Sequence, residues 1–269
     1  MRTRAVPVAI AVALTLLLAA CSSSDRDGPG VYLALGDSLS EGVGATDREN
    51  TAFVPLVHQA LGEGWELTNL GHSGDTSAQL HEHGHIDTAI AMITESRMLD
   101  DDPTNDVRLV TLEIGGNDLL SLFFDLVLPG TCPNLEESLR RDECVGALEQ
   151  TLARFRPNLA EALDMLEEAD PDLRVVLLTL YSPFSGDNPL ATPALEQLAE
   201  LALEGLPDTP FPEGLNDIIR EEAASRDVTL VDLWPLFEGK AGEYIANDFI
   251  HPNDEGYRVM ADAVIEVVP

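Results

Sequence analysis

The sequence predicts an α/β domain built on a parallel sheet. Short apolar runs, each suited to a strand, alternate along the chain with stretches whose apolar residues recur at helical spacing. The first run, residues 31–35, is apolar throughout, which is typical of a strand buried on both faces of a parallel sheet, and the run at 107–114 alternates little. Several of the runs end in turns rich in Gly, Asp and Asn. The predicted strands span residues 31–35, 65–70, 107–114, 173–180 and 228–232.

The first twenty residues have the pattern of a secretory signal. Arg2 and Arg4 precede an uncharged apolar run over residues 5–20, which is short for a membrane span. The run ends in the sequence LAAC at Cys21, which resembles the bacterial lipobox. That resemblance implies cleavage before Cys21, lipid attachment to its sulfur, and export to the outer side of the bacterial membrane, either extracellular or periplasmic. An ordinary signal followed by a chance cysteine is the alternative. Residues 21–30 are polar and unpatterned, so we expect a flexible tether.

Length, composition and charge restrict the class of protein. Of the 269 residues, 45% are hydrophobic, which is enough for a sizeable core. The motifs described below are spread over the whole chain, so we expect one domain over residues 31–269. The 15 Lys and Arg residues face 48 Asp and Glu residues, giving a formal charge of −33. Such a surface repels phosphate backbones, so nucleic acid is excluded as a partner.

The first predicted strand ends in a turn that places a hydroxyl group for chemistry. Gly36 permits a tight turn after residues 31–35, and Asp37 and Ser38 follow. Ligands of open α/β sheets bind beyond the carboxyl ends of the strands, so Ser38 is a candidate nucleophile. The alternative is that Asp37 and Ser38 only cap the next helix, because both are good N-cap residues.

The second predicted strand also runs into a glycine-rich turn. A helix is predicted over residues 51–61, with Pro55 suited to its first turn, and the strand at 65–70 follows. The turn over residues 71–76 contains Gly74, where the backbone can approach a substrate closely and its N–H can act as a donor. Such turns also simply terminate strands.

Three histidines follow this turn at alternate positions, namely His81, His83 and His85. Imidazoles two residues apart on a strand share a face, so a metal site is conceivable. However, residues 86–93 have the pattern of a helix. We therefore expect solvated loop histidines, and neither a metal ion nor another cofactor.

The predicted central strand, residues 107–114, ends in a third polar turn. It is followed by two glycines, Asn117 and Asp118. The amide of Asn117 can donate a hydrogen bond where negative charge develops on a substrate oxygen. Alternatively, Asn117 or Asp118 caps the helix predicted over residues 119–126.

Two insertions separate the later elements. Residues 128–144 are irregular and contain Cys132 and Cys144, which are the remaining pair if Cys21 is lipidated. An even number of cysteines in an exported protein predicts a disulfide, and two free buried thiols are the alternative. Residues 181–212 are rich in Pro, Leu and Ala. Insertions at the carboxyl edge of a sheet form the walls or lid of a pocket, and this apolar content suggests an acyl or similar group.

The rest of the chain supplies helices, the last strand and a fourth motif. Helices are predicted over residues 145–169, 215–224 and 254–267. Asp248 and His251 lie three residues apart in the last irregular segment. At this spacing a carboxylate can accept a hydrogen bond from Nδ1–H of the imidazole, which leaves Nε2 as a general base.

Together the four motifs resemble the SGNH/GDSL hydrolases. The matching blocks are GDSLS (36–40), SGDT (73–76), GGND (115–118) and DFIHP (248–252), and they occur in the order of the family. The resemblance implies a flavodoxin-like three-layer α/β/α sandwich with a five-stranded parallel sheet. It also implies that Ser38 is the nucleophile, His251 its general base and Asp248 the residue that orients the base. The backbone N–H groups of Ser38 and Gly74 and the side chain of Asn117 would form the oxyanion hole.

The expected function is that of a serine esterase without a cofactor. It would hydrolyse carboxylic esters, either short-chain acyl or lipid esters, through an acyl-serine intermediate. A carbohydrate O-acetylesterase using the same site is one alternative, and a non-catalytic, lipid-anchored binding protein on a hydrolase scaffold is another. The α/β-hydrolase fold is disfavoured because no Gly-x-Ser-x-Gly sequence occurs in the chain.

Overall fold

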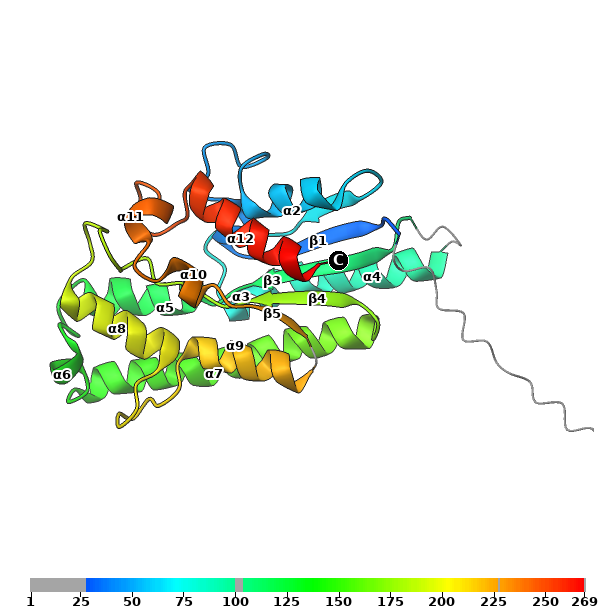
Figure 1. The fold of residues 1–269 in the computed structure, drawn as a ribbon. Coiled ribbons are helices and arrows are strands. Elements are labelled where there is room, and N and C mark those ends of the chain that lie inside the picture. The colour runs from blue at the N-terminus through cyan, green and yellow to red at the C-terminus, as the bar shows by residue number, and fades with distance from the viewer. Residues whose placement is uncertain (1–27, 100–103, 227, 269) are drawn as a thin grey trace, which may run out of the picture.

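The computed structural model describes residues 28–99, 104–226 and 228–268 (Figure 1). The predicted signal segment, Cys21 and most of the predicted tether lie outside the described residues. The lipoprotein anchor and its location therefore stay predictions. Within the described ranges, none of the helices combines the length and the apolar character that a membrane span requires.

The sheet contains five parallel strands in the order β2-β1-β3-β4-β5. All five predicted strands are confirmed, and their ends differ from the predicted ones by no more than two residues. This order is that of the flavodoxin-like sandwich, and it reverses direction between β1 and β3. The carboxyl ends of β1 and β3 therefore form the topological switch point. The strands are β1 (Val31–Gly36), β2 (Glu66–Asn69), β3 (Val107–Glu113), β4 (Arg174–Leu178) and β5 (Thr229–Val231).

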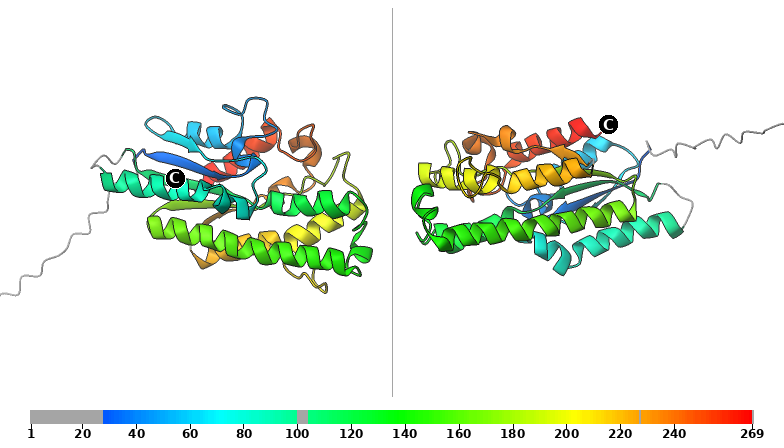
Figure 2. Two further views of the ribbon diagram at one scale, coloured as in Figure 1. Left: turned by 180° about the vertical axis from the view of Figure 1, so that it is seen from behind. Right: turned by 90° about the horizontal axis from the view of Figure 1, so that it is seen from below.

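Helices cover both faces of the sheet, so the molecule has three layers (Figures 1 and 2). Side chains alternate along β1, so that Leu33 and Leu35 pack on one face and Tyr32 and Ala34 on the other. The first face is covered by α3 (Ser77–Glu82), α4 (His85–Leu99), α7 (Asp142–Ala169) and α9 (Leu215–Ser225). The second face is covered by α2 (Phe53–Leu61), α10 (Trp234–Phe237) and α12 (Asp254–Val267).

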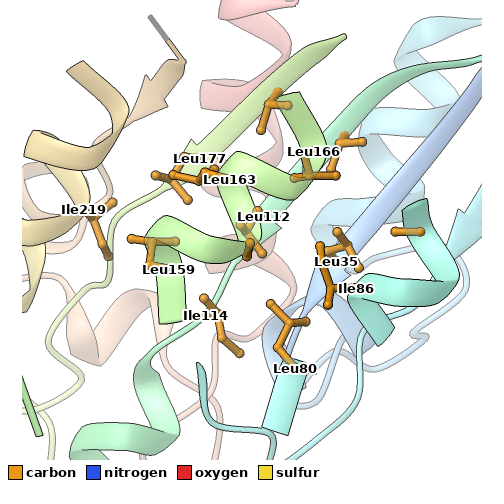
Figure 3. Packing of buried hydrophobic residues seen from close by; sticks show 14 of the residues in the cluster. Leu35, Leu80, Ile86, Leu112, Ile114, Leu159, Leu163, Leu166, Leu177 and Ile219 are labelled. Atoms are coloured by element: carbon orange, nitrogen blue, oxygen red, sulfur yellow. The ribbon is translucent and has the colours of Figure 1, made fainter. Parts of the chain in front are cut away.

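The larger core lies between the sheet and the α3, α4, α7 and α9 layer. Figure 3 shows Leu35 and Leu112, from two central strands, in one cluster with side chains from several helices, including Ile86 and Leu163. These four residues are at most 2% exposed. Burying one such side chain contributes about 1.5–3 kcal/mol. The scaffold is therefore fixed by the layers, and the loops at the strand ends are free to carry function.

The two insertions contain more helix than expected. Residues 128–144 include α6 (Leu135–Ser138), and α7 begins three residues before its predicted start. The second insertion carries α8 (Pro193–Glu204), whose N-cap is Thr192. The helix predicted over 119–126 begins earlier and has two parts, α5 (Gly116–Leu122) and the π-helical segment η1 (Phe123–Val127).

Cys132 and Cys144 form a disulfide, as predicted. The bond links the segment after η1 to the first turn of α7, across a sequence separation of 12. Closing a loop of this length stabilises the folded chain by up to about 3 kcal/mol in the chain-entropy picture. The alternative of two free thiols is wrong for this structure.

Candidate active site

The turn after β1 requires a glycine. Gly36 has a φ of +148°, and a Cβ at this position would lie 2.2 Å from the backbone oxygen of Glu113. The short helix α1 (Ser38–Glu41) follows, and its N-cap is Asp37, whose Oδ1 accepts from the N–H of Leu39 at 3.1 Å. Asp37 thus has the predicted capping role. Ser38 is the first residue of the helix and is free of that role.

Ser38, His251 and Asp248 form one hydrogen-bonded chain. Nε2 of His251 lies 2.9 Å from Oγ of Ser38, although the two residues are 213 positions apart in sequence. Nδ1 of the same ring lies 2.7 Å from Oδ2 of Asp248. Ser38 is 7% exposed, so its hydroxyl is shielded from most solvent. The structure therefore brings the three predicted side chains together in the predicted order, serine to imidazole to carboxylate.

The loop that carries the imidazole is organised by Asp248. Its Oδ1 accepts from the backbone N–H groups of Ile250 and His251, each at 3.0 Å. Burial alone would raise the pKa of Asp248, but these two hydrogen bonds and the His251 ring lower it below its ordinary value. Asp248 is consequently ionised at neutral pH. Phe249, the residue after Asp248 in this loop, has a φ of +67°, which is uncommon for a non-glycine residue.

Two side chains of the second insertion hold this loop in place. The hydroxyl of Tyr181 donates to the backbone oxygen of Ile250 at 2.8 Å. Nδ2 of Asn188 donates to the backbone oxygens of Phe249 at 3.1 Å and of Pro183 at 2.6 Å. Both side chains are buried, and sequence reasoning missed both. The only signal in the sequence is a pair of polar groups within a mainly apolar insertion.

The turn after β2 places Gly74 facing open space. Its φ is +91°, and no atom lies within 4 Å of the position that a Cβ would occupy. Among the described residues, its N–H has no hydrogen-bond acceptor. Glu41 of α1 accepts from the N–H of Ser73 at 2.8 Å, and Asp118 accepts from the N–H and Oγ of Ser77 at 2.8 and 2.7 Å. The turn is thereby tied to its neighbours on both sides, while the Gly74 N–H is available to a ligand.

Asn117 links the turns after β1 and β2. Its Nδ2 donates to Oδ2 of Asp37 at 3.0 Å and to the backbone oxygen of Asp75 at 2.9 Å. The helix α5 begins at Gly116 with Gly115 as its N-cap, so the alternative that Asn117 caps this helix is wrong. Both hydrogens of the Asn117 amide are engaged. A substrate oxygen that accepts one of them has to replace one of these two bonds.

A pair of buried carboxyl groups lies beneath the site and was not predicted. Glu113 ends β3 and Asp37 follows β1, and they are 0% and 2% exposed. Burial raises the pKa of Asp37 to about 6. Burial and the neighbouring Asp37 raise the pKa of Glu113 well above its ordinary value. The available signal was an acidic residue at the end of a strand rich in Val and Leu.

We expect Glu113→Gln to change how stability depends on pH. Between its unfolded pKa of about 4.5 and its raised folded pKa, Glu113 binds more protons in the folded state than in the unfolded state. It therefore lowers the free energy of unfolding progressively as pH rises above 4.5. Because glutamine does not titrate, the variant should gain stability relative to the wild type from pH 5 to pH 8. Urea denaturation across this range measures the difference, and a difference that is constant with pH would contradict the expectation.

An apolar pocket of about 170 Å³ opens beside the hydrogen-bonded chain. Its polar lining includes Ser38, Asn117 and His251, and its walls are mostly Leu, Phe, Val and Ala from α5, η1, α7 and α8. Both insertions contribute, for example through Cys132 and Phe184. The helices α5 and α8 lie together at one end of the molecule (Figure 1). The insertions thus line a pocket, as expected from their position.

A serine hydroxyl joined to an imidazole and a carboxylate, at the switch point of this sheet, is the arrangement of a hydrolytic enzyme. The model of the GDSL-like lipase/acylhydrolase family matches residues 34–259. The chain belongs to this family and is an ester-hydrolysing enzyme.

Individual relatives agree with this assignment. The spore germination lipase LipC of Bacillus licheniformis is 25% identical over 235 residues, which cover 86% of this chain and 92% of the relative. The lipase Lip_vut3 from a goat rumen metagenome has a TM-score of 0.60 and 22% identity, over 87% of this chain and 95% of its own. An extracellular lipase of Streptomyces rimosus has a TM-score of 0.56 and 17% identity, and the match covers 89% of this chain and 100% of the lipase. The two solved structures confirm the SGNH hydrolase fold.

Proposed function

We propose that this enzyme hydrolyses carboxylic esters that carry an apolar acyl chain, with Ser38 as the nucleophile. One observation carries the proposal: the apolar pocket is lined at once by Ser38, His251 and Asn117 and by the side chains of two leucine-rich helices. An acyl chain in this pocket would place its carbonyl carbon beside the Ser38 hydroxyl. The acyl chain of a lipid ester would fill the apolar pocket, and that of a short-chain ester would fill only part of it.

The geometry supports acyl transfer in two steps. Nε2 of His251 takes the Ser38 proton as Oγ attacks the ester carbonyl, and the ionised Asp248 stabilises the resulting imidazolium. The N–H groups of Ser38 and Gly74, with the Asn117 amide, hold the oxyanion. When the intermediate collapses, His251 returns the proton to the leaving alcohol and an acyl-serine remains. Water deprotonated by His251 then attacks the acyl-serine, the bond between the acyl carbon and Oγ breaks, and His251 returns the proton to Oγ as the carboxylic acid is released.

The character of the pocket favours a chain longer than acetyl. Each buried methylene contributes about 0.8 kcal/mol, which corresponds to about a fourfold gain in kcat/KM when the chain is bound in the transition state. An acetyl group would occupy only the part of the pocket next to Ser38. The leucine-lined remainder then has no counterpart in an acetylated sugar, so carbohydrate O-acetylesterase activity is not favoured.

A hydrolysis profile with p-nitrophenyl esters of two to twelve carbons tests the proposal. We expect kcat/KM to rise with chain length until the pocket is filled. Ala199→Trp, in the α8 wall, should shift the preferred chain to a shorter one. Gln197→Trp on the exposed side of the same helix is the matched control and should leave the profile unchanged. A profile that falls from acetate onward, with better turnover of acetylated sugars, would overturn the proposal.

We expect Asn117→Ala to lower kcat by about 10²–10³-fold, or about 2.7–4 kcal/mol, as for other oxyanion donors. The reason is that one amide hydrogen would move from Asp37 or Asp75 to the oxyanion as charge develops. Steady-state hydrolysis of a preferred p-nitrophenyl ester measures the effect, with thermal unfolding as a check on the fold. A loss below about tenfold would show that Asn117 serves only to link the two turns.

A further inference from the structure

Four side chains outside the catalytic site converge on one point. They are His72 and Asp75 of the turn after β2, His83 at the end of α3 and His85 at the start of α4. One ligand atom from each lies within 4.8 Å of those of the others. The expectation of solvated loop histidines is therefore wrong for His81 and His85, which lie in helices, whereas His83 is the C-cap of α3 and is 43% exposed. His81 alone points elsewhere, because it lies within α3 and its Nε2 is 2.9 Å from the backbone oxygen of Asn158.

The histidines surround the carboxylate of Asp75. Nδ1 of His72 and Nδ1 of His83 each lie 2.9 Å from its Oδ1, and Nε2 of His85 lies 3.2 Å from its Oδ2. The ring centroids of the three imidazoles are 5.2, 5.8 and 6.1 Å apart. The Asp75 side chain is only 2% exposed, while the rings are 23–56% exposed. The cluster thus has a buried base and an open side through which an ion can enter.

Hydrogen bonds do not account for the contact between His85 and Asp75. Nε2 of His85 and Oδ2 of Asp75 are both buried, and within the described part of the chain neither has a hydrogen-bond partner, although they face each other at 3.2 Å. Buried polar atoms are almost always hydrogen-bonded, so an unpaired nitrogen beside an unpaired oxygen requires a different explanation. A cation bound by both atoms would satisfy them.

Charge leads to the same conclusion. Among the described residues, the only ion-pair partners of Asp75 are these three histidines, and neither Lys nor Arg contacts its carboxylate. With neutral imidazoles the buried carboxylate has no compensating charge, which is costly. A divalent cation would supply that charge and satisfy both unpaired atoms.

We propose that His72, Asp75, His83 and His85 bind one Zn²⁺ ion. Three imidazole nitrogens and one carboxylate oxygen are ligands that Zn²⁺ accepts in tetrahedral sites, whereas Mg²⁺ and Ca²⁺ prefer oxygen. Zinc bonds of about 2.0–2.1 Å place tetrahedral ligand atoms about 3.3–3.4 Å apart. The nitrogens of His72 and His83 lie 2.9 Å from Oδ1 of Asp75, within about half an ångström of that spacing, and all four ligand atoms lie within 4.8 Å of one another. Nε2 of His85 lies 3.2 Å from the second carboxylate oxygen, Oδ2.

The ion would stabilise the turn that carries Gly74. Two ligands, His72 and Asp75, flank Gly74 within that turn, and the other two belong to the α3–α4 junction. The backbone oxygen of Asp75 also accepts from Asn117. Zinc would therefore fasten this turn to the helical layer, and amide exchange over residues 71–76 should slow when zinc binds.

Metal binding by the untagged full-length chain tests the proposal. The protein is stripped with EDTA, loaded with Zn²⁺ and dialysed, and the bound metal is measured by mass spectrometry. We expect one Zn²⁺ per chain, a Tm that rises with zinc concentration, and visible absorption typical of tetrahedral Co²⁺ when Co²⁺ is substituted. His83→Ala and His85→Gln should each weaken zinc binding at least about tenfold.

His81→Gln is the matched control, because it removes an imidazole from the same stretch but not from the cluster. It should bind zinc as the wild type does. Absence of a stoichiometric ion in the loaded wild type, or equal weakening in His81→Gln and His83→Ala, would overturn the proposal. Two separate ligand variants keep the test valid if one of them fails to fold. None of these measurements uses ester hydrolysis, so their failure leaves the proposed function intact.

Discussion

Replacing Ser38 by alanine is expected to reduce ester hydrolysis by at least about 10⁴-fold while the chain still folds. The substitution removes the Oγ that lies 2.9 Å from Nε2 of His251, so no acyl-enzyme can form. Alanine fits the position, because the residue lies in the first turn of α1 and its hydroxyl does not cap that helix. Hydrolysis of a p-nitrophenyl ester measures the loss, and circular dichroism and thermal unfolding report on the fold.

Ser40→Ala is the matched control for this experiment. Ser40 lies two residues away in the same helix, but its Oγ donates to the backbone oxygen of Leu35 at 3.1 Å, away from His251. A fluorophosphonate probe, which labels only an activated serine, should react with the wild type and with Ser40→Ala but not with Ser38→Ala. An unlabelled wild-type protein would instead indicate the non-catalytic binding protein, and labelled Ser38→Ala would place the nucleophile elsewhere.

Asp248→Asn is expected to lower kcat by about 10³–10⁴-fold with a small effect on stability. Ionised Asp248 fixes the ring by accepting from Nδ1–H of His251, and this leaves Nε2 unprotonated toward Ser38. An asparagine can present its NH₂ group to Nδ1, which favours the opposite tautomer. The Asp248 side chain is 42% exposed, so the fold does not depend on its burial. Steady-state hydrolysis and thermal unfolding measure the two effects.

Asp254→Asn is the control for the loss of a carboxylate near the same loop. Asp254 is also held by hydrogen bonds, to Thr46 and Thr51, and its pKa is lowered as well, but it does not contact His251. Its replacement should leave kcat unchanged. A loss below about tenfold in Asp248→Asn would mean that the contacts of Tyr181 and Asn188 suffice to orient the imidazole loop.

The elements that the sequence predicts well are those with local causes. A uniformly apolar run that stops at Gly36 is visible within a few residues, and so is the three-residue spacing of Asp248 and His251. The parallel order of the sheet follows once such strands alternate with helices. The helix α8 also has local signals, a Thr192 N-cap followed by Pro193, but they lie inside a Pro-rich stretch that reads as irregular.

The parts that could not be predicted depend on contacts between distant residues. Glu113 meets Asp37 only because β1 and β3 are neighbours in the sheet, with Gly36 opposite Glu113. The two hydrogen bonds of Asn117 join turns that follow three different strands. His72 lies nine residues before His81, the nearest of the alternating histidines. A rule that groups histidines at alternate positions, as on a strand, therefore includes His81, which is outside the cluster. It omits Asp75, whose buried carboxylate lies at the centre of the cluster.

The reacting side chains and the pocket walls come from different parts of the chain. Ser38 follows β1, and Asp248 and His251 lie in the loop before α12, whereas much of the apolar wall belongs to α5, η1, α7 and α8. Related enzymes can therefore change their substrate preference by replacing residues 193–212, while the residues that hydrolyse the ester stay the same. Tyr181 and Asn188 set the limit of that freedom, since they anchor the imidazole loop. A chimaera that carries α8 of a relative should thus still hydrolyse esters through Ser38, and it should prefer the acyl-chain length that the relative prefers.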